Sequence, residues 1–198
     1  MNLDNNISPL TKTAVEAAIK AGIEILEVYY NSDFDIEFKT DNSPVTLADK
    51  RAHNVIVEHL STTNIPVLSE EGKTAPFDER KNREIFWLVD PLDGTKEFIK
   101  RNNEFTVNIA LIKRQTPIGG VVFVPVTKVI YWADEYGSFK AQVDEENNLL
   151  NEIEKLTGFA EKEKFVMVGS KSHMNRETED FIRSIDTKGK AIEMVTKG

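Results

Sequence analysis

The sequence predicts a layered α/β or α+β protein, and three observations lead to that prediction. Two stretches near the N-terminus, residues 8–30 and 46–60, repeat apolar side chains at helical spacing. A strand-rich middle over residues 84–143 follows at hairpin spacing. The final stretch, residues 164–195, reads as strand, helix and strand. Helices beside a sheet and a terminal βαβ-like segment are typical of layered folds.

Each expected element has its own local signal. Ser8 is a suitable N-cap and Pro9 a suitable first helical residue, so the first helix begins there and runs to about Tyr30. The Gly119-Gly120 pair predicts a bulge or a close backbone approach within its strand. The other expected elements are a helix over 175–185 and strands over 34–38, 65–69, 84–90, 104–113, 117–126, 128–134, 137–143, 164–169 and 191–195.

Residues 84–90 are a nearly continuous apolar run, which predicts a strand buried on both faces. Pro91 lacks an N–H group and fixes its own φ, so we expect this strand to end before it. Polar or charged loops are expected over 73–82 and 144–163.

Charge and composition exclude several classes of protein. The 198 residues are 40% hydrophobic, which permits a packed core. The net charge of −8 argues against a general nucleic-acid binder, because such proteins carry a basic face. The chain has no cysteine, so disulfides, thiolate catalysis and thiolate zinc sites are excluded.

The N-terminus lacks the basic and apolar regions of a signal peptide. No apolar run approaches the roughly 20 residues of a transmembrane segment. We therefore expect a soluble cytoplasmic protein, with peripheral association at the inner face of the cell membrane left open.

The stretch FWLVDPLDGTKEF, residues 86–98, ends an apolar run in a tight polar corner. Asp90 and Asp93 follow the expected strand, at the edge where open sheets place their binding sites. Gly94 permits a tight turn, and Thr95 adds a hydroxyl. Two aspartates at one corner repel each other unless a cation lies between them, and hard oxygen ligands suit Mg²⁺. The corner therefore predicts a magnesium site that can take a phosphate.

More ordinary interpretations exist for the acidic groups. Asp-Pro and Asp-Gly are frequent turn pairs, but DPLDGT directly after a buried strand disfavours that interpretation. Glu70 and Glu71 close the preceding short strand, as solvated loop residues or as neighbours of the corner. Asp49 fits a capping box with Thr46 as well as it fits a functional role.

The remaining histidines and tryptophans have structural interpretations. His53 and His59 share a helix without metal-ligand spacing, so we expect surface or packing roles for them. Trp87 and Trp132 lie in expected strands, which favours core positions over ligand stacking.

The corner, together with LSEEG (68–72) and PVTLAD (44–49), resembles the inositol monophosphatase superfamily of metal-dependent phosphatases. The closer resemblance is to its 3′(2′),5′-bisphosphate nucleotidase branch. Inositol monophosphatases usually show Thr-Asn-Phe after DGT, whereas this chain has Lys-Glu-Phe at 96–98. RNNEFTVNIALI (101–112) and VGSKSH (168–173) are also similar to the nucleotidase branch.

The resemblance runs from about Leu10 to Gly198 and implies an αβαβα sandwich. It also implies a Mg²⁺-dependent phosphomonoesterase that removes the 3′(2′)-phosphate from adenosine 3′(2′),5′-bisphosphate. The products would be AMP and phosphate, within sulfur assimilation and nucleotide recycling. The implied partner is this small nucleotide bisphosphate and not a nucleic-acid polymer.

The resemblance also implies a set of metal ligands. Glu70, Asp90 and the backbone carbonyl of Leu92 would hold one Mg²⁺. Asp90 and Asp93 would share a second, and a third ion near Asp49 is compatible with the motif. Two such ions can clamp the attacking and leaving oxygens of an in-line displacement.

The same resemblance implies roles for the reacting groups. Asp49 and Thr95 would position and deprotonate the nucleophilic water. Gly94 and Thr95 would give backbone N–H groups to the phosphate. His173 would contact the other phosphate or the sugar of the nucleotide, although helix capping by Ser172 also explains its motif. The implied substrate-contacting set is Glu70, Leu92, Asp93, Gly94, Thr95 and His173.

One family signature is absent. Members of the superfamily carry a later Trp-Asp motif whose aspartate completes the second metal site, whereas Trp87 and Trp132 precede Leu88 and Ala133. We therefore expect a single domain over residues 1–198 that lacks the C-terminal portion of its second α/β half. The expected consequences are a weaker second metal site, exposed apolar surface that invites association such as a homodimer, and poor hydrolysis by this chain alone.

Three other functions stay open. A phosphatase of the haloacid dehalogenase type also uses strand-borne aspartates, but that motif separates them by one residue and here Pro91 and Leu92 intervene. A non-catalytic metal- or phosphate-binding protein would tolerate the missing ligand. Inositol monophosphatase or fructose-1,6-bisphosphatase activity would use the same scaffold.

Overall fold

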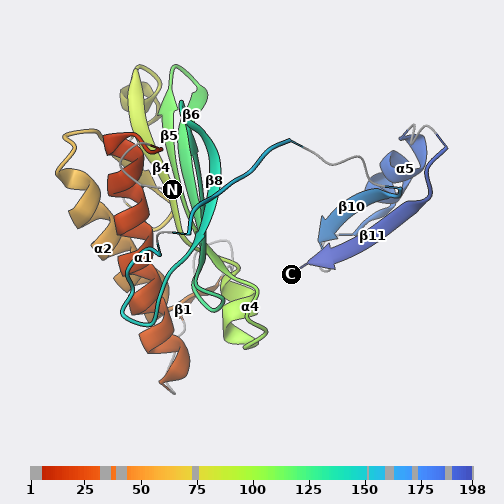
Figure 1. Ribbon diagram of the computed structural model, residues 1–198, viewed down its shortest axis with the longest axis horizontal. Coiled ribbons are helices and arrows are strands. Elements are labelled where there is room, and N and C mark those ends of the chain that lie inside the picture. Colours follow the sequence, from red (N-terminus) through yellow and green to blue (C-terminus); the bar gives the residue numbers. More distant parts are fainter. Residues whose placement is uncertain are drawn as a thin grey trace. The chain divides into compact units, whose positions relative to one another are not determined.

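The computed structural model describes residues 6–31, 37–38, 44–72, 76–150, 152–158, 163–170, 174–185 and 189–197. The chain divides into two units, Met1–Thr157 and Gly158–Gly198. In the first unit, two long helices lie along one face of a seven-stranded sheet (Figure 1). In the second unit, two parallel strands pair with each other and one helix connects them. The predicted layered class of fold is confirmed.

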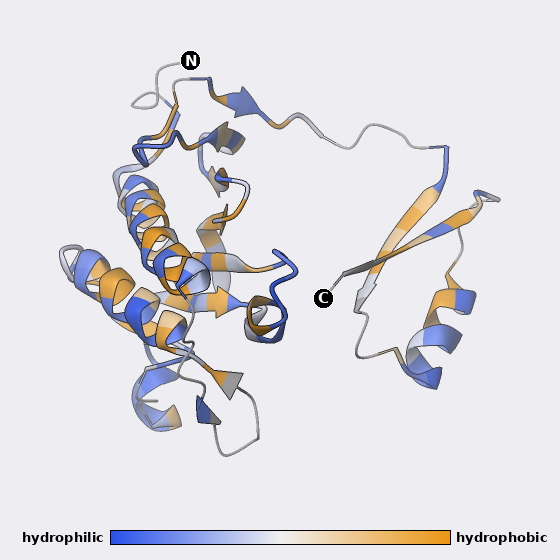
Figure 2. Ribbon diagram, turned by 90° about the horizontal axis from the view of Figure 1, so that it is seen from below, coloured by the Kyte–Doolittle hydropathy of each residue, from blue (hydrophilic) through white to orange (hydrophobic). Residues whose placement is uncertain are grey.

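Two helices form the layer beside the sheet. α1 spans Pro9–Tyr30, and its N-cap Ser8 accepts a hydrogen bond from the backbone N–H of Thr11 at 3.2 Å. α2 spans Leu47–Ser61 and begins with a capping box at Thr46. Both helices are amphipathic, with apolar and hydrophilic residues interleaved along each (Figure 2). The predicted starts of both helices are confirmed.

The sheet of the first unit is mixed. Its strands, in spatial order, are β3 (Val67–Ser69), β4 (Ile85–Asp93), β5 (Thr106–Lys113), β6 (Thr116–Val124), β7 (Val129–Asp134), β8 (Gly137–Gln142) and β9 (Glu154–Lys155). β3 and β4 are parallel, and every later neighbouring pair is antiparallel. β1 (Glu37–Phe38) and β2 (Pro44–Val45) pair separately, and residues 34–36 of the expected first strand lie outside the described residues.

Two expectations for β4 are wrong. The strand does not end before Pro91, because a bulge between Asp90 and Asp93 accommodates the residue that lacks an N–H group. Burial is also one-sided: Trp87 is 1% exposed, whereas Leu88 is 45% exposed. Strand pairing on both edges satisfies the backbone of β4, but α1 and α2 lie on one face. An apolar run therefore does not require burial on both faces.

Short elements lie within both expected loops, and β9 falls inside the loop expected over 144–163. A helical turn, α3 (Phe77–Arg80), occupies part of the predicted loop over 73–82, and its first-turn acids favour the helix N-terminus. The register of β5 and β6 shifts beside Gly119, which confirms the predicted bulge.

Three aromatic rings anchor the short helix α4 (Thr95–Ile99) to the core. Tyr29, Phe98 and Phe105 pack with ring centroids 4.9–5.3 Å apart. Each of the three is at most 3% exposed. The Tyr29 hydroxyl also donates a hydrogen bond to Oδ1 of Asn103 at 2.8 Å. This cluster fixes the position of the chain that directly follows β4.

The second unit is a βαβ segment. β10 (Phe165–Ser170) and β11 (Ile192–Lys197) are parallel, and α5 (Arg176–Ser184) connects them. Asn175 caps α5 by accepting a hydrogen bond from the backbone N–H of Thr178 at 2.8 Å. The predicted strand, helix and strand are confirmed. Among the helices that the structure describes, none has the length and apolar character needed to cross a membrane.

A close approach between α1 and β6 gives a first testable prediction. Gly22→Ala should lower the free energy of unfolding by about 1–3 kcal/mol, because the core has no room for the added methyl. The new Cβ would lie 2.3 Å from Cε1 of Phe123. In an unobstructed helix the same change stabilises by up to about 1 kcal/mol. Urea denaturation measures the difference.

The matched control is a double-mutant cycle with Phe123→Leu. The cost of Gly22→Ala should be smaller in the Phe123→Leu background, because the shorter side chain leaves space for the methyl. A Gly22→Ala chain as stable as the unsubstituted one would contradict this packing.

Candidate active site

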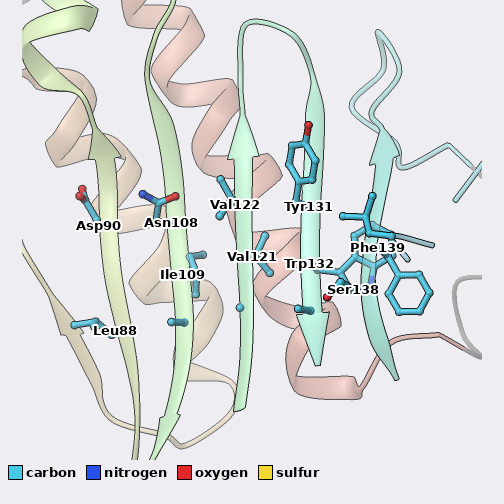
Figure 3. Close-up of a pocket in the computed structure, with 14 residues that line it drawn as sticks. Leu88, Asp90, Asn108, Ile109, Val121, Val122, Tyr131, Trp132, Ser138 and Phe139 are labelled. Atoms are coloured by element: carbon cyan, nitrogen blue, oxygen red, sulfur yellow. The ribbon is translucent and has the colours of Figure 1, made fainter. Parts of the chain in front are cut away.

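The corner predicted from DPLDGT lies at the end of β4. Asp90 is paired across the sheet with Asn108, and Asp93 with Thr106, with Pro91 and Leu92 in the bulge between them. Figure 3 shows the Asp90 and Asn108 side chains at the same level of the two neighbouring strands. The bulge places two residues between the aspartates and keeps both aspartates at the C-terminal end of β4.

Gly94 makes the turn out of the strand possible. Its φ is +94°, a conformation that other residues rarely adopt. A Cβ at this position would also lie 2.8 Å from the backbone oxygen of Glu104. Helix α4 begins at the next residue, Thr95. The predicted tight turn is present and a helix follows it directly, so Gly94 and Thr95 lie side by side next to the two aspartates.

Asp49 serves the helix cap and the site at once. Its Oδ2 accepts hydrogen bonds from the backbone N–H and the hydroxyl of Thr46, at 2.7 and 2.6 Å. Its Oδ1 lies 3.1 Å from Oγ1 of Thr95, 46 residues along the chain. The same Thr95 hydroxyl lies 3.2 Å from the backbone oxygen of Leu92. The sequence favours neither the capping role nor the functional role of Asp49 over the other. These contacts show that one side chain can fill both roles.

Glu70 reaches the same edge of the sheet through β3. Its backbone N–H donates to the carbonyl of Val89 at 3.0 Å, which continues the parallel pairing of β3 and β4. Because Ser69 is paired with Val89, the continued register places Glu70 at the level of Asp90 on the neighbouring strand. Strand pairing, and not proximity in the sequence, brings these two carboxylates to one place.

The electrostatics of the corner are those of crowded like charges. Burial, followed by the negative charges of Glu70 and Asp93, raises the pKa of Asp90 to about 7. Burial also raises the pKa of Asp49, against hydrogen bonds from Thr46 and Thr95 that lower it. A cation among these groups would stabilise the charged form of Asp90.

The oxygen donors of the corner are of the type that a hard divalent cation prefers, but their side chains do not gather around one point. Carboxylates and a backbone carbonyl are the oxygen donors that Mg²⁺ prefers. Within the described part of the chain, no three Asp, Glu, His or Cys side chains gather at distances that hold a metal ion. The Asp90 pKa nevertheless responds to Glu70, Asp93 and Asp49, so all four carboxylates lie within electrostatic reach. Side-chain rotation would be needed for them to share an ion.

Two residues near the corner escape sequence reasoning. Asn108 donates a hydrogen bond from Nδ2 to Oδ2 of Asp93 at 3.1 Å, and Thr106 donates to Oδ1 of Asn108 at 3.2 Å. His53 Nδ1 lies 2.8 Å from Oγ of Ser69, the residue before Glu70. The expectation of a packing or surface role for His53 misses this contact. The polar Asn within the apolar run FTVNIALI is the only sequence signal for Asn108.

The other expected residues have simpler positions. His59 lies on the surface of α2, where its Nε2 is 3.3 Å from a carboxylate oxygen of Glu16. Trp87 and Trp132 are 1% and 2% exposed, which confirms core positions. His173 lies outside the described residues, so its expected contact with the nucleotide stays a prediction.

An apolar cavity of about 470 Å³ extends from the corner over the sheet face that carries Asp90. Figure 3 shows its side chains along β4 to β8. The lining comprises Leu88, Asp90, Asn108, Ile109, Ala110, Gly120, Val121, Val122, Tyr131, Trp132, Ala133, Ser138, Phe139 and Leu156. Of these, Asp90 and Asn108 belong to the corner described above.

Comparisons with known proteins agree with the sequence resemblance. The 3′(2′),5′-bisphosphate nucleotidase CysQ of Shigella flexneri is 43% identical over 173 residues, covering 86% of this chain and 67% of that protein. The nucleotidase CysQ of Salmonella typhimurium is 52% identical over 130 residues, covering 64% of this chain and 52% of that protein. The chain thus spans between about half and two thirds of the length of these curated relatives.

A solved structure and a family model give the same answer. The crystal structure of CysQ from Bacteroides thetaiotaomicron, described as a bacterial member of the inositol monophosphatase family, matches with a TM-score of 0.79. The sequences are 42% identical, and the match covers 95% of this chain and 72% of that chain. The model of the inositol monophosphatase family matches residues 6–192. The chain therefore belongs to the inositol monophosphatase family, and its resemblance to the 3′(2′),5′-bisphosphate nucleotidase branch is confirmed.

Proposed function

We propose that the chain is a Mg²⁺-dependent phosphomonoesterase acting on adenosine 3′(2′),5′-bisphosphate. It would release the 3′(2′)-phosphate and leave AMP, a reaction suited to nucleotide recycling in sulfur assimilation. Identities of 43–52% to curated bisphosphate nucleotidases support this substrate class over inositol phosphates. The geometric observation that carries the proposal is the Thr95 hydroxyl, within hydrogen-bond distance of both Asp49 and the Leu92 carbonyl.

The metal ligands in this proposal are residues of the corner. Enzymes of this family are metal-dependent and typically use Mg²⁺. Glu70, Asp90 and the carbonyl of Leu92 would hold one ion, and Asp90 with Asp93 a second. When bound, the ions neutralise phosphate charge and lower the pKa of a coordinated water. A third ion on Asp49 is disfavoured, because both of its carboxylate oxygens already accept hydrogen bonds.

Asp49 and Thr95 supply the proton path. A water would donate to Oγ1 of Thr95 while Thr95 donates to Oδ1 of Asp49. As the water oxygen attacks phosphorus, the water gives its proton to Thr95 and Thr95 gives its own hydroxyl proton to Asp49. The P–O bond to the ribose oxygen breaks, and that oxygen takes up a proton from solvent. Because burial raises the pKa of Asp49, this carboxylate is a stronger base than an ordinary aspartate. Hydrogen bonds from Thr46 hold it in place.

Gly94 and Thr95 are proposed to bind the transferred phosphate through the backbone of the turn. Their N–H groups lie at the start of α4, where the helix dipole favours negative charge. The absence of a Cβ at Gly94 permits the close approach of backbone and ligand. Phosphoryl transfer needs mainly positioning and charge neutralisation, so no protein nucleophile is required.

Metal and phosphate binding without turnover is a second candidate function. It is favoured by the spread of the carboxylates, because no three described acidic or histidine side chains gather as metal ligands. In that case Mg²⁺ would still promote ligand binding, but no phosphate would be released.

The substrate proposal predicts a ranking. With Mg²⁺ present, phosphate release from adenosine 3′,5′-bisphosphate should exceed that from inositol 1-phosphate and from fructose 1,6-bisphosphate, each by at least about tenfold in kcat/KM. A colorimetric phosphate assay on the chain, with EDTA as the metal-free control, measures the three rates. A preference for either sugar phosphate would contradict the proposed substrate. Mg²⁺-dependent nucleotide binding by calorimetry without any release would support the second candidate.

A matched pair of variants tests the proton path. Thr95→Val removes the hydroxyl at nearly constant volume and should lower kcat by about 10²-fold or more. Thr95→Ser keeps the hydroxyl and should retain most of the activity. Mg²⁺ affinity, measured by calorimetry, should be similar in both, because the Thr95 side chain is not a proposed ligand. Equal kcat in the two variants would contradict the path through Thr95.

The charge of Asp90 predicts a pH effect on stability. The folded-state pKa of about 7 lies above the ordinary aspartate value of 3.8, so the folded chain holds an extra proton between these pH values. The contribution of Asp90 to stability is therefore lost as pH rises through this window in EDTA. Asp90→Asn should stabilise the metal-free chain at pH 8 by about 1–2 kcal/mol after allowance for solvent screening, and by less at pH 5.

Urea denaturation at both pH values measures this effect. Glu135→Gln, which neutralises an exposed carboxylate, is the control and should change neither value. Mg²⁺ should stabilise the unsubstituted chain at pH 8 more than it stabilises Asp90→Asn. If Asp90→Asn stabilises the chain less at pH 8 than at pH 5, the raised pKa of Asp90 is contradicted.

A further inference from the structure

A second cavity, lined in part by cationic side chains, lies beside α3. Its volume is about 400 Å³, within the range of small-molecule pockets. Three cationic and three apolar side chains dominate its lining: Arg80, Lys81, Arg83, Leu68, Phe77 and Phe86. None of these six residues belongs to the acidic corner or to the proposed catalytic machinery.

The cavity and the corner lie at opposite ends of one strand. Phe86 precedes Asp90 by four residues of β4, or about 13 Å at the rise of a β-strand. Because side chains alternate along a strand, Phe86 and Asp90 share the sheet face that also carries exposed Leu88. The two sites are therefore separate but on the same side of the sheet.

The cations of this cavity are incompletely paired. Lys81 forms an ion pair with Asp78, which is itself 83% exposed. Among the described residues, no carboxylate pairs with the guanidinium of Arg80 or Arg83. The Nε of Arg80 is buried and has no hydrogen-bond partner in the described structure. Buried polar groups are ordinarily hydrogen-bonded, so this donor indicates a missing acceptor.

An aromatic wall accompanies the positive charge. The Phe77 ring is 67% exposed, and the guanidinium carbon of Arg80 lies 5.9 Å from its centroid. Lys81 Nζ lies at the same distance. Together with Phe86 and Leu68, this ring offers apolar surface directly beside the unpaired donor. An inorganic anion would leave the apolar wall exposed, and an apolar ligand would leave Arg80 unpaired.

We propose that this cavity is a metal-independent binding site for a small anion that carries an aromatic ring, of the nucleoside monophosphate class. The phosphate oxygens accept hydrogen bonds from Arg80 and Arg83, and the ring packs against Phe77. The proposal does not depend on the hydrolytic function, because the cavity contains none of the corner residues.

Binding of AMP to the chain in EDTA tests the proposal. Without divalent cations the carboxylates of the corner repel a phosphate, so binding there is suppressed. Calorimetry should detect one AMP site, and adenosine and inorganic phosphate should each bind at least tenfold more weakly. Asp90→Asn should leave the AMP affinity unchanged. If AMP does not bind in EDTA, or if phosphate alone binds as tightly as AMP, the proposal is overturned.

Variants locate the site. Arg80→Gln and Arg83→Gln should each weaken AMP binding at least fivefold, whereas Phe77→Ala should weaken AMP more than phosphate. Arg114→Gln is the matched control, because Arg114 is 77% exposed and pairs with Glu84 outside the cavity lining. Circular dichroism confirms that each variant is folded, and Arg83→Gln keeps the test valid if Arg80→Gln is not. Unchanged AMP affinity in a folded Arg83→Gln chain would place the ligand elsewhere and overturn the assignment.

Discussion

The repulsion among carboxylates at the end of β4 is the constraint on which the rest of the site depends. Asp90 is partly buried beside Glu70 and Asp93, and its pKa is raised to about 7 as a result. A protein gains nothing in stability from such crowding, because each added negative charge raises the cost of the next. The arrangement is useful when a divalent cation and a phosphate complete it. The cation neutralises the carboxylates, and the carboxylates then hold the cation where it can meet the phosphate.

The fold holds this corner with ordinary packing. A bulge lets β4 pass through Pro91 and present both aspartates at one edge. Gly94 turns the chain at φ +94°, and the rings of Tyr29, Phe98 and Phe105 fix the helix that follows. The capping box of α2 orients Asp49 toward Thr95. At the other end of β4, the basic cavity beside α3 has the opposite charge. One strand thus connects a site suited to cations with a site suited to anions.

Sequence reasoning predicts the parts that rest on local chemistry. The cap at Ser8, the turn at Gly94 and the strands at hairpin spacing are all confirmed. It fails where the outcome depends on neighbours: Leu88 is exposed although its strand is apolar, and Pro91 lies inside β4 because a bulge accommodates it. The family resemblance supplies the roles of Asp90 and Asp93. The contacts from Asn108 and His53 come from distant elements, so no local pattern predicts them.

Asp90 is a carboxylate whose charge requires a bound cation in this site. Carbon-13 NMR of the Asp90 carboxyl group, assigned by its loss in Asp90→Asn and titrated with and without Mg²⁺, measures this directly. We expect a pKa of about 7 in EDTA and a marked fall when Mg²⁺ is added. An ordinary aspartate pKa in EDTA that Mg²⁺ leaves unchanged would contradict it.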